Sequence, residues 1–120
     1  MATLSKNLER QVSKGTLDAE KAQAARARIR TSTDYAQLSG AQLVIEAATE
    51  NLQLKQRILQ QVAGNVAADC LIATNTSSLS VTQLAASIEH PERFIGVHFF
   101  NPVPMMALVE IIRGLQTSDA

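Results

Sequence analysis

The sequence has a single cysteine, Cys70, no tryptophan and no excess of charge of either sign. One cysteine excludes an intrachain disulfide and a zinc site built from several cysteines. The 11 Lys and Arg residues balance the 11 Asp and Glu residues, which argues against nucleic-acid binding, because that needs an excess of basic side chains. No apolar run approaches the roughly 18 residues of a membrane-spanning helix, and residues 1–8 hold no apolar signal-peptide segment. These absences predict a cytoplasmic protein without nucleic-acid or membrane partners.

Hydrophobic residues make up 46% of the 120 residues and charged residues 18%, which is typical of a folded globular protein. A chain of this length can bury about two-thirds of its unfolded surface as one small domain. The sequence contains no internal repeat, low-complexity tract or interdomain linker. We therefore expect a single domain over residues 1–120.

The first 30 residues predict two helices. Leu4, Leu8 and Val12 recur every four residues and predict an amphipathic helix that ends at Gly15. The segment from Asp18 to about Ile29 is rich in strong helix formers but poor in bulky apolar residues. It predicts a helix that is exposed over most of its surface.

The remaining sequence alternates between short apolar runs and segments with helical spacing. Two helices are predicted, over residues 51–66 and 80–89. Five strands are predicted, over residues 28–31, 42–46, 70–74, 94–99 and 108–112. Strands that alternate with helices of this length indicate an α/β fold with a mostly parallel sheet and right-handed crossovers.

Polar residues follow three of the predicted strands. Glu46 and Glu50 come after the apolar run at 43–45, residues 74–78 (TNTSS) after the run at 70–73, and His98 and Asn101 after the run at 94–97. In an open α/β sheet, ligands bind beyond the carboxyl ends of the strands. The pattern therefore predicts a shared binding crevice and says little about the reaction.

Each polar group also has a purely structural interpretation. Residues 76–78 precede a predicted helix and are suited to capping it. Glu50 and Asn51 are suited to capping the helix that follows them, where the helix dipole favours a carboxylate. On these residues alone, capping and ligand contact stay equally open.

His98 lies among apolar neighbours and is interpretable as a core histidine with a satisfied hydrogen bond. Glu110, on the neighbouring predicted strand, is a candidate partner that would fix its tautomer and make it a general base. Glu110 is equally free to face solvent. The other histidine, His90, precedes Pro91 in an expected surface loop, so no metal site is predicted.

Three motifs resemble the 3-hydroxyacyl-CoA dehydrogenase family. Residues 44–55 (VIEAATENLQLK) are similar to its V-x-E-A-x-x-E-x-x-x-x-K stretch, and residues 75–78 (NTSS) and 98–105 (HFFNPVPM) match two further signatures in order and spacing. Glu110 follows His98 by twelve residues, as in the family. The similarity extends from about residue 5 to the C-terminus and is strongest to the bacterial 3-hydroxybutyryl-CoA dehydrogenases within this family.

The resemblance implies an oxidoreductase that interconverts 3-hydroxyacyl-CoA, above all 3-hydroxybutyryl-CoA, and 3-oxoacyl-CoA in fatty acid and butanoate metabolism. It implies that His98 is the general base and that Glu110 orients His98 and stabilises its imidazolium. It also implies that Ser77 hydrogen-bonds the substrate oxygen. A base with an acidic partner and a hydroxyl donor on adjacent strand ends suits hydride transfer.

The resemblance further implies NAD or NADP as the cofactor and a Rossmann-type domain that holds it. Ser77 and Asn101 would contact the nicotinamide portion. Glu50 and Lys55 would contact the cofactor near its ribose and the CoA substrate.

The sequence departs from the family at both ends. The family opens with a G-x-G-x-x-G turn that holds the pyrophosphate, whereas the glycines here lie far apart, at positions 15, 40, 64, 96 and 114. The residue that distinguishes NAD from NADP, about 20 residues beyond that turn, is absent as well. The all-helical domain that completes the acyl-CoA pocket and forms the family's homodimer is also absent. We therefore expect residues 1–120 to be a partial NAD(P)-binding domain that is inactive by itself.

Two other hypotheses compete with the dehydrogenase. One is a non-catalytic, stand-alone α/β module that serves binding or interaction. The other is a Ser–His hydrolase that uses Ser77 or Ser78 with His98, which is disfavoured because neither serine lies in a G-x-S-x-G motif.

Overall fold

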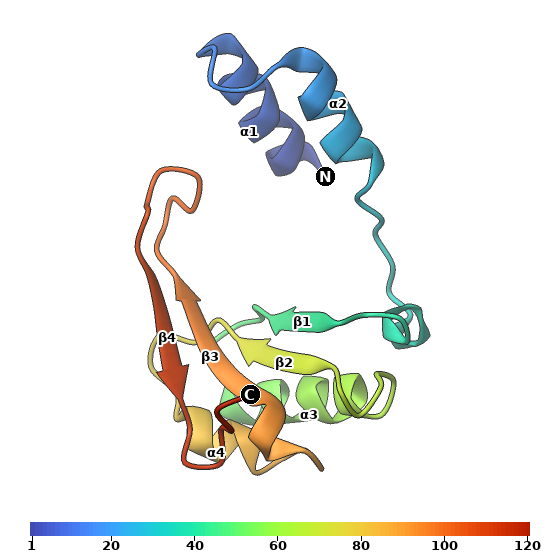
Figure 1. Ribbon diagram of the computed structural model, residues 1–120, viewed down its shortest axis with the longest axis vertical. Coiled ribbons are helices and arrows are strands. Elements are labelled where there is room, and N and C mark those ends of the chain that lie inside the picture. The colour runs from blue at the N-terminus through green and yellow to red at the C-terminus, as the bar shows by residue number, and fades with distance from the viewer. The chain divides into compact units, whose positions relative to one another are not determined.

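The structure is a computed structural model that describes residues 1–120. The chain forms two compact units, residues 1–33 and residues 34–120, and each is described by itself. Figure 1 shows the helices and strands in chain order. None of the helices has the length and apolar content that crossing a membrane requires.

Residues 1–33 form a pair of helices, α1 (Ala2–Ser13) and α2 (Ala19–Ala27), as predicted. Gly15 lies in the turn between them with a φ of 72°, in the left-handed region that favours glycine. Ala22 is the one buried residue of the pair. The apolar stripe predicted for α1 is half-buried and consists of Leu4, Leu8 and Val12.

The prediction of a strand over residues 28–31 is wrong. Arg28 ends α2, where its backbone N–H donates to the carbonyl of Ala25, and the residues that follow form neither strand nor helix. A strand needs a neighbour that exchanges ladder hydrogen bonds with it. The alternation of arginine with Ile29 imitates a strand pattern, but Ile29 is exposed and no strand pairs with this segment.

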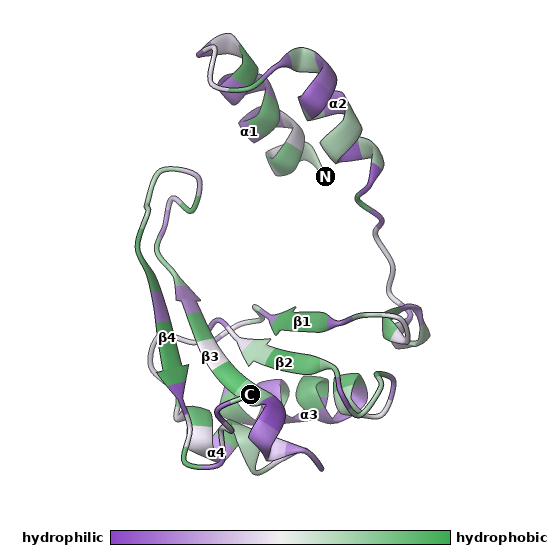
Figure 2. Ribbon diagram, viewed as in Figure 1, coloured by the Kyte–Doolittle hydropathy of each residue, from purple (hydrophilic) through white to green (hydrophobic).

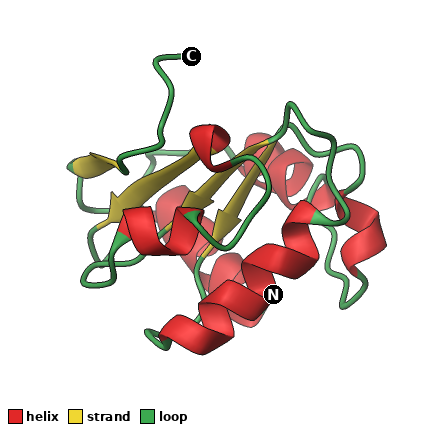
Figure 3. Ribbon diagram, turned by 90° about the horizontal axis from the view of Figure 1, so that it is seen from below, coloured by secondary structure: helices red, strands yellow, loops and turns green.

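Residues 34–120 contain a four-stranded sheet in the order β1-β2-β3-β4. The first three strands are parallel and β4 runs antiparallel to β3, which confirms the mostly parallel sheet. Figure 3 shows the strands in yellow. Their bounds are Leu43–Glu46, Leu71–Thr74, Phe94–Phe99 and Val109–Arg113.

Two helices connect the parallel strands. α3 (Leu52–Ala63) follows β1 and ends before Gly64, close to its predicted bounds. α4 (Val81–Ala85) is shorter than predicted, because residues 87 and 88 bond to carbonyls only three residues back and so form tight turns. Two short 3₁₀ helices, Tyr35–Leu38 and Pro91–Arg93, precede β1 and β3.

The hydrophobic core lies between one face of the sheet and the helices α3 and α4. Leu59, Leu84 and Phe94 are fully buried there. The opposite face carries apolar side chains that stay exposed, and Figure 2 shows β1 and β4 largely in the hydrophobic colour. These exposed residues are Leu43, Ile45, Leu71, Val109 and Ile111.

Gly96, in the middle of β3, lets α4 approach the sheet closely. A Cβ atom at this position would lie 2.9 Å from Cγ2 of Val81 and 3.0 Å from Cβ of Ile112. Both neighbours are themselves packed, Val81 in the buried core and Ile112 on β4 against it. The absence of a side chain at residue 96 therefore fixes the start of α4, which directly follows the loop of residues 75–80.

We predict that Gly96→Ala lowers the free energy of unfolding by about 1–3 kcal/mol, the usual cost of inserting a methyl group into a packed core. Gly40→Ala is the matched control, because an added Cβ at Gly40 meets no atom within 4 Å. Urea unfolding of both variants beside the unmodified chain measures the difference. Equal stabilities of the two variants would contradict the close approach at Gly96.

Candidate functional site

The carboxyl ends of β1, β2 and β3 meet at one edge of the sheet because the three strands run parallel. Glu46, which ends β1, lies opposite Thr74, which ends β2, and Thr74 lies opposite Gly96 of β3. Asn75 bonds to both neighbouring strands, since its N–H donates to the Glu46 carbonyl at 2.8 Å and its Oδ1 accepts from the N–H of Phe99 at 2.9 Å. The predicted convergence of polar residues at this edge is confirmed.

The Glu50 carboxylate holds the loop that follows β2. It accepts hydrogen bonds from the hydroxyl of Thr76 at 2.6 Å, the hydroxyl of Ser78 at 3.2 Å and the backbone N–H of Ser77 at 3.3 Å. The Thr76 side chain is buried and also accepts from the N–H of Leu79 at 3.1 Å. Residues 26 to 28 positions apart in the sequence are thus joined through one carboxylate.

These bonds lower the pKa of the Glu50 carboxyl below its ordinary value. The hydrogen bond from Thr76 is the largest cause, and the bonds from Ser77 and Ser78 and the positive charge of Lys55 act in the same direction. Desolvation of the carboxyl opposes the shift. Glu50 is therefore negatively charged at neutral pH and presents a carboxylate beside Ser77.

The capping interpretation holds for one of the two segments. Asn51 caps α3, with its Oδ1 accepting from the N–H of Leu54 at 2.9 Å. α4 is capped by Ser80, whose hydroxyl accepts from the N–H of Gln83 at 3.2 Å. Residues 76–78 therefore do not cap α4, and Glu50 does not cap α3.

His98 and Glu110 face each other across the antiparallel pair β3 and β4. They are direct partners in the strand register, and Nδ1 of His98 lies 2.9 Å from Oε1 of Glu110. The side chain of His98 is 18% exposed and that of Glu110 is 52% exposed. The ring of Phe100 lies 4.5 Å from the imidazole, centroid to centroid.

The Glu110 carboxylate assigns the tautomer of His98. A neutral imidazole beside a carboxylate carries its proton on the nitrogen that faces the carboxylate, here Nδ1. Nε2 is then left with a lone pair. The pairing predicted between the two residues is present, and it leaves Nε2 as the ring nitrogen able to accept a hydrogen bond.

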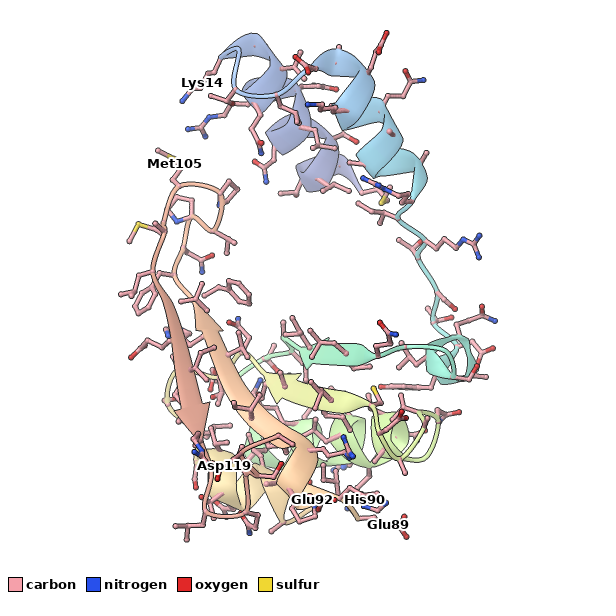
Figure 4. All side chains as sticks on the ribbon, viewed as in Figure 1. Lys14, Glu89, His90, Glu92, Met105 and Asp119 are labelled. Atoms are coloured by element: carbon pink, nitrogen blue, oxygen red, sulfur yellow. The ribbon has the colours of Figure 1, made fainter.

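Ser77 and Asn101 are exposed residues near the same edge. The Ser77 hydroxyl takes part in no hydrogen bond within the chain, since only its backbone N–H is used. Asn101 lies in the connection between β3 and β4, whose far end carries Met105 in Figure 4. The structure joins Ser77 to Glu50 and His98 to Glu110, and it joins Asn101 to neither pair by a hydrogen bond.

Lys55 lies beneath this edge, and its side chain is fully buried. Its Nζ is bonded to both carboxylate oxygens of Glu46, at 2.8 and 3.0 Å, and to the carbonyl of Ala48 at 3.0 Å. The resemblance implies a contact between Lys55 and the cofactor, and the structure places its ammonium group at the end of β1, bonded to Glu46 and Ala48.

Sequence reasoning missed the ion pair of Lys55 with Glu46 and the bridging role of Asn75. A signal for the ion pair is present in the sequence, because Lys55 lies in the buried stripe of α3 with Leu59 and Val62. A charged residue in an apolar stripe requires a buried partner. No comparable signal identifies Asn75.

His90, which was expected in a surface loop, is exposed and precedes the 3₁₀ helix Pro91–Arg93. Its Nδ1 lies 3.2 Å from Oε1 of Glu92, and Figure 4 labels the two residues beside each other, away from the edge just described. The structure contains no group of three or more side chains suited to bind a metal ion.

Comparison with known proteins identifies the family. The family described as "3-hydroxyacyl-CoA dehydrogenase, NAD binding domain" matches residues 1–120. The chain belongs to this family. The description names NAD as the cofactor that the 3-hydroxyacyl-CoA dehydrogenase domain binds, and so favours NAD over NADP.

Individual members of the family are closely similar. The chain is 45% identical over 120 residues to a 3-hydroxybutyryl-CoA dehydrogenase of Bradyrhizobium diazoefficiens, of which it covers 41%. It is 43% identical over 119 residues to the fatty acid oxidation complex subunit alpha of Psychrobacter cryohalolentis, of which it covers 17%. The crystal structure of (S)-3-hydroxybutyryl-CoA dehydrogenase from Ralstonia eutropha superposes with a TM-score of 0.95 at 54% identity over 98% of this chain and 42% of that protein. The chain thus spans less than half the length of these relatives.

The residues at the sheet edge fit one half of NAD. A carboxylate, a serine hydroxyl and an asparagine amide suit the hydroxyls of a ribose and the amide of nicotinamide. The pyrophosphate half requires a glycine-rich turn at a helix N-terminus, and residues 1–120 contain no such turn. Glu50, Ser77 and Asn101 are therefore the candidates for the nicotinamide side.

We predict that Glu50→Gln lowers the free energy of unfolding at neutral pH but leaves it unchanged in acid. Because the folded state lowers the pKa of Glu50, the unfolded state binds more protons and the contribution of Glu50 is fully present above the ordinary carboxyl pKa. It is lost as the pH falls through the lowered pKa of the folded state. Thermal unfolding of both proteins across this range measures the difference, which should disappear at the acid end. A difference that is independent of pH would contradict this role of the carboxylate.

Proposed function

We propose that the protein carrying this chain interconverts 3-hydroxyacyl-CoA and 3-oxoacyl-CoA with NAD, and that 3-hydroxybutyryl-CoA is its preferred substrate. The observation that carries the proposal is the 2.9 Å contact between His98 and Glu110, on the strand beside β2, whose carboxyl end begins the loop that carries Ser77. The names of the similar proteins support the substrate class. A place in fatty acid or butanoate metabolism would follow from that substrate.

His98 is the general base in this proposal. Its Nε2 accepts the proton of the 3-hydroxyl group while the hydrogen on C3 leaves as a hydride. The Glu110 carboxylate holds Nδ1 and stabilises the imidazolium that forms. In the reverse direction the same imidazolium returns the proton to the oxygen.

NAD supplies the hydride acceptor when it is bound. Ser77 places its hydroxyl beside the substrate oxygen and the nicotinamide, held in position by Glu50. Asn101 contacts the nicotinamide from the connection between β3 and β4. Glu50 contacts the ribose from the turn after β1.

Further properties of the whole protein belong to the same proposal. In this proposal the whole protein is a homodimer, and an all-helical domain forms the dimer and completes the acyl-CoA pocket. Without a glycine-rich turn to hold the pyrophosphate, residues 1–120 alone are expected to be inactive. The proposal also places the protein in the cytoplasm.

We predict that His98→Gln lowers kcat about 100-fold or more, the usual contribution of a general base. Glu110→Gln is also expected to lower kcat, because the amide does not stabilise the imidazolium. NADH formation from 3-hydroxybutyryl-CoA, catalysed by a full-length protein that carries residues 1–120, measures both effects. His90→Gln is the matched control and should leave kcat unchanged, because His90 is exposed and paired only with Glu92.

The same assay separates the dehydrogenase from its alternatives. Near-normal activity of the His98→Gln variant would contradict the assignment of His98 as the general base. A stably folded protein that neither binds NADH nor turns over 3-hydroxybutyryl-CoA would favour a non-catalytic binding module. Ester hydrolysis sensitive to a serine-directed inhibitor would favour the Ser–His hydrolase.

A further inference from the structure

The end of β3 that carries His98 extends beyond its neighbour β2. The ladder between the two strands ends at the pair of Thr74 and Gly96, whereas β3 continues to Phe99. A backbone N–H past the end of a ladder needs an acceptor from another part of the chain. For Phe99 this acceptor is the side chain of Asn75, the residue that directly follows β2.

The side chain of Asn75 continues the ladder. Its Oδ1 accepts from the N–H of Phe99 at 2.9 Å, and so replaces the carbonyl that a further residue of β2 would offer. Because only the oxygen of an amide accepts from an N–H, this contact also settles the orientation of the Asn75 amide. The peptide group that leads from His98 to Phe99 is therefore held from the side of β2.

Asn75 is itself fixed in the parallel part of the sheet. Its backbone N–H donates to the carbonyl of Glu46 at 2.8 Å, across to β1, and Figure 1 shows β1, β2 and β3 as neighbouring strands. Asn75 is also the first residue of the loop that carries Ser77, which Glu50 holds through its carboxylate. One residue thus joins the strand that carries His98 to the two strands that lead to Glu50 and Ser77.

The other support of His98 comes from the opposite side of β3. Glu110 lies on β4, the last strand of the sheet, and its side chain is 52% exposed. An ion pair that is open to water restrains geometry weakly. Glu110 orients the imidazole, but it does not connect β3 to the loop that carries Ser77. In the proposed reaction, Nε2 of His98 and the hydroxyl of Ser77 must reach the same substrate oxygen, so their spacing requires a connection from the side of β2.

We propose that Asn75 is a positioning residue that fixes His98 relative to the loop carrying Ser77. Its Oδ1 holds the peptide group after His98, and its own backbone begins the loop, so that the base and the hydroxyl face one substrate oxygen. Asn75 acts through these neighbours and exchanges no proton itself. This inference rests on the proposed function, since it assigns Asn75 a role in the same reaction.

Two substitutions of Asn75 separate its acceptor oxygen from its shape. Asn75→Leu keeps a branched side chain of similar size but removes the acceptor for the N–H of Phe99. Asn75→Asp keeps an oxygen at the same place, and a carboxylate accepts from an N–H at least as strongly as an amide does. Oxidation of 3-hydroxybutyryl-CoA by a full-length protein that carries residues 1–120 gives kcat and the KM for NAD. Both are compared on the alkaline plateau of the pH profile, where a general base is fully deprotonated and an added charge no longer changes its protonation.

Positioning predicts that Asn75→Leu lowers the plateau kcat about tenfold or more, because displacing a reacting group by about 1 Å can lower a rate about 100-fold. The KM for NAD should change less than about threefold, since the substitution removes no contact that the proposal assigns to NAD. Asn75→Asp should keep kcat within about threefold of the unmodified protein. Where Asn75→Leu does not fold, Asn75→Ala removes the same acceptor without apolar bulk and is compared with Asn75→Asp instead.

Thr82→Val is the matched control. It also removes one side-chain acceptor from one backbone N–H, because the hydroxyl of Thr82 accepts from the N–H of Leu115 at 3.0 Å. This bond lies past the C-terminal end of β4, whereas Glu110 lies near its start. Thr82→Val should therefore lower the melting temperature and leave kcat unchanged.

Three results would overturn the inference alone. The first is an Asn75→Leu variant that melts at a lower temperature but keeps its kcat, which has lost only stability. The second is an Asn75→Asp variant as slow as Asn75→Leu on the plateau, since the acceptor is then not what matters. The third is a raised KM for NAD with an unchanged kcat, which indicates a cofactor contact. An unmodified protein that does not oxidise 3-hydroxybutyryl-CoA overturns the proposed function, and the inference with it.

Discussion

The buried carboxylate of Glu46 is the group on which the arrangement of the site depends. It accepts bonds from Ala48 in the following turn, from Thr74 on the neighbouring strand and from Lys55 on α3. One group thus joins β1, β2 and α3 at the edge where the polar strand ends meet. A buried charge of this kind is tolerated only while its partners remain, so the local backbone is fixed as a unit.

The side chains that shape the loops of the site are different from those proposed to exchange a proton. Glu46 and Glu50 bond to backbone and hydroxyl groups and set the shape of two loops. The side chains of His98 and Glu110 bond only to each other, across β3 and β4, and that of Glu110 is half-exposed. The supporting carboxylates belong to the parallel part of the sheet, and the pair proposed to exchange the proton lies on its single antiparallel pair of strands. This division suits hydride transfer, which requires a fixed cofactor beside a base that exchanges a proton.

Most of the fold could be predicted from local patterns. The apolar runs at residues 42–46, 70–74, 94–99 and 108–112 lie within one or two residues of the observed strands, because apolar periodicity reports burial directly. The run at 28–31 failed because its alternating pattern has no neighbour to pair with, which a local pattern cannot reveal. The helix over 80–89 ended early because Ser87 and Ile88 bond to carbonyls only three residues back, a change of hydrogen-bond partner that apolar periodicity does not reveal.

By itself, the sequence determined the α/β class, the family and the identity of the residues at the strand ends, because motifs and periodicity are local in the chain. Only the tertiary structure decided which of these residues meet. The antiparallel register of β3 and β4 places Glu110 opposite His98, and the packing of α3 under β1 brings Lys55 to Glu46. Such pairings depend on strand register and burial, which arise only when distant segments pack together.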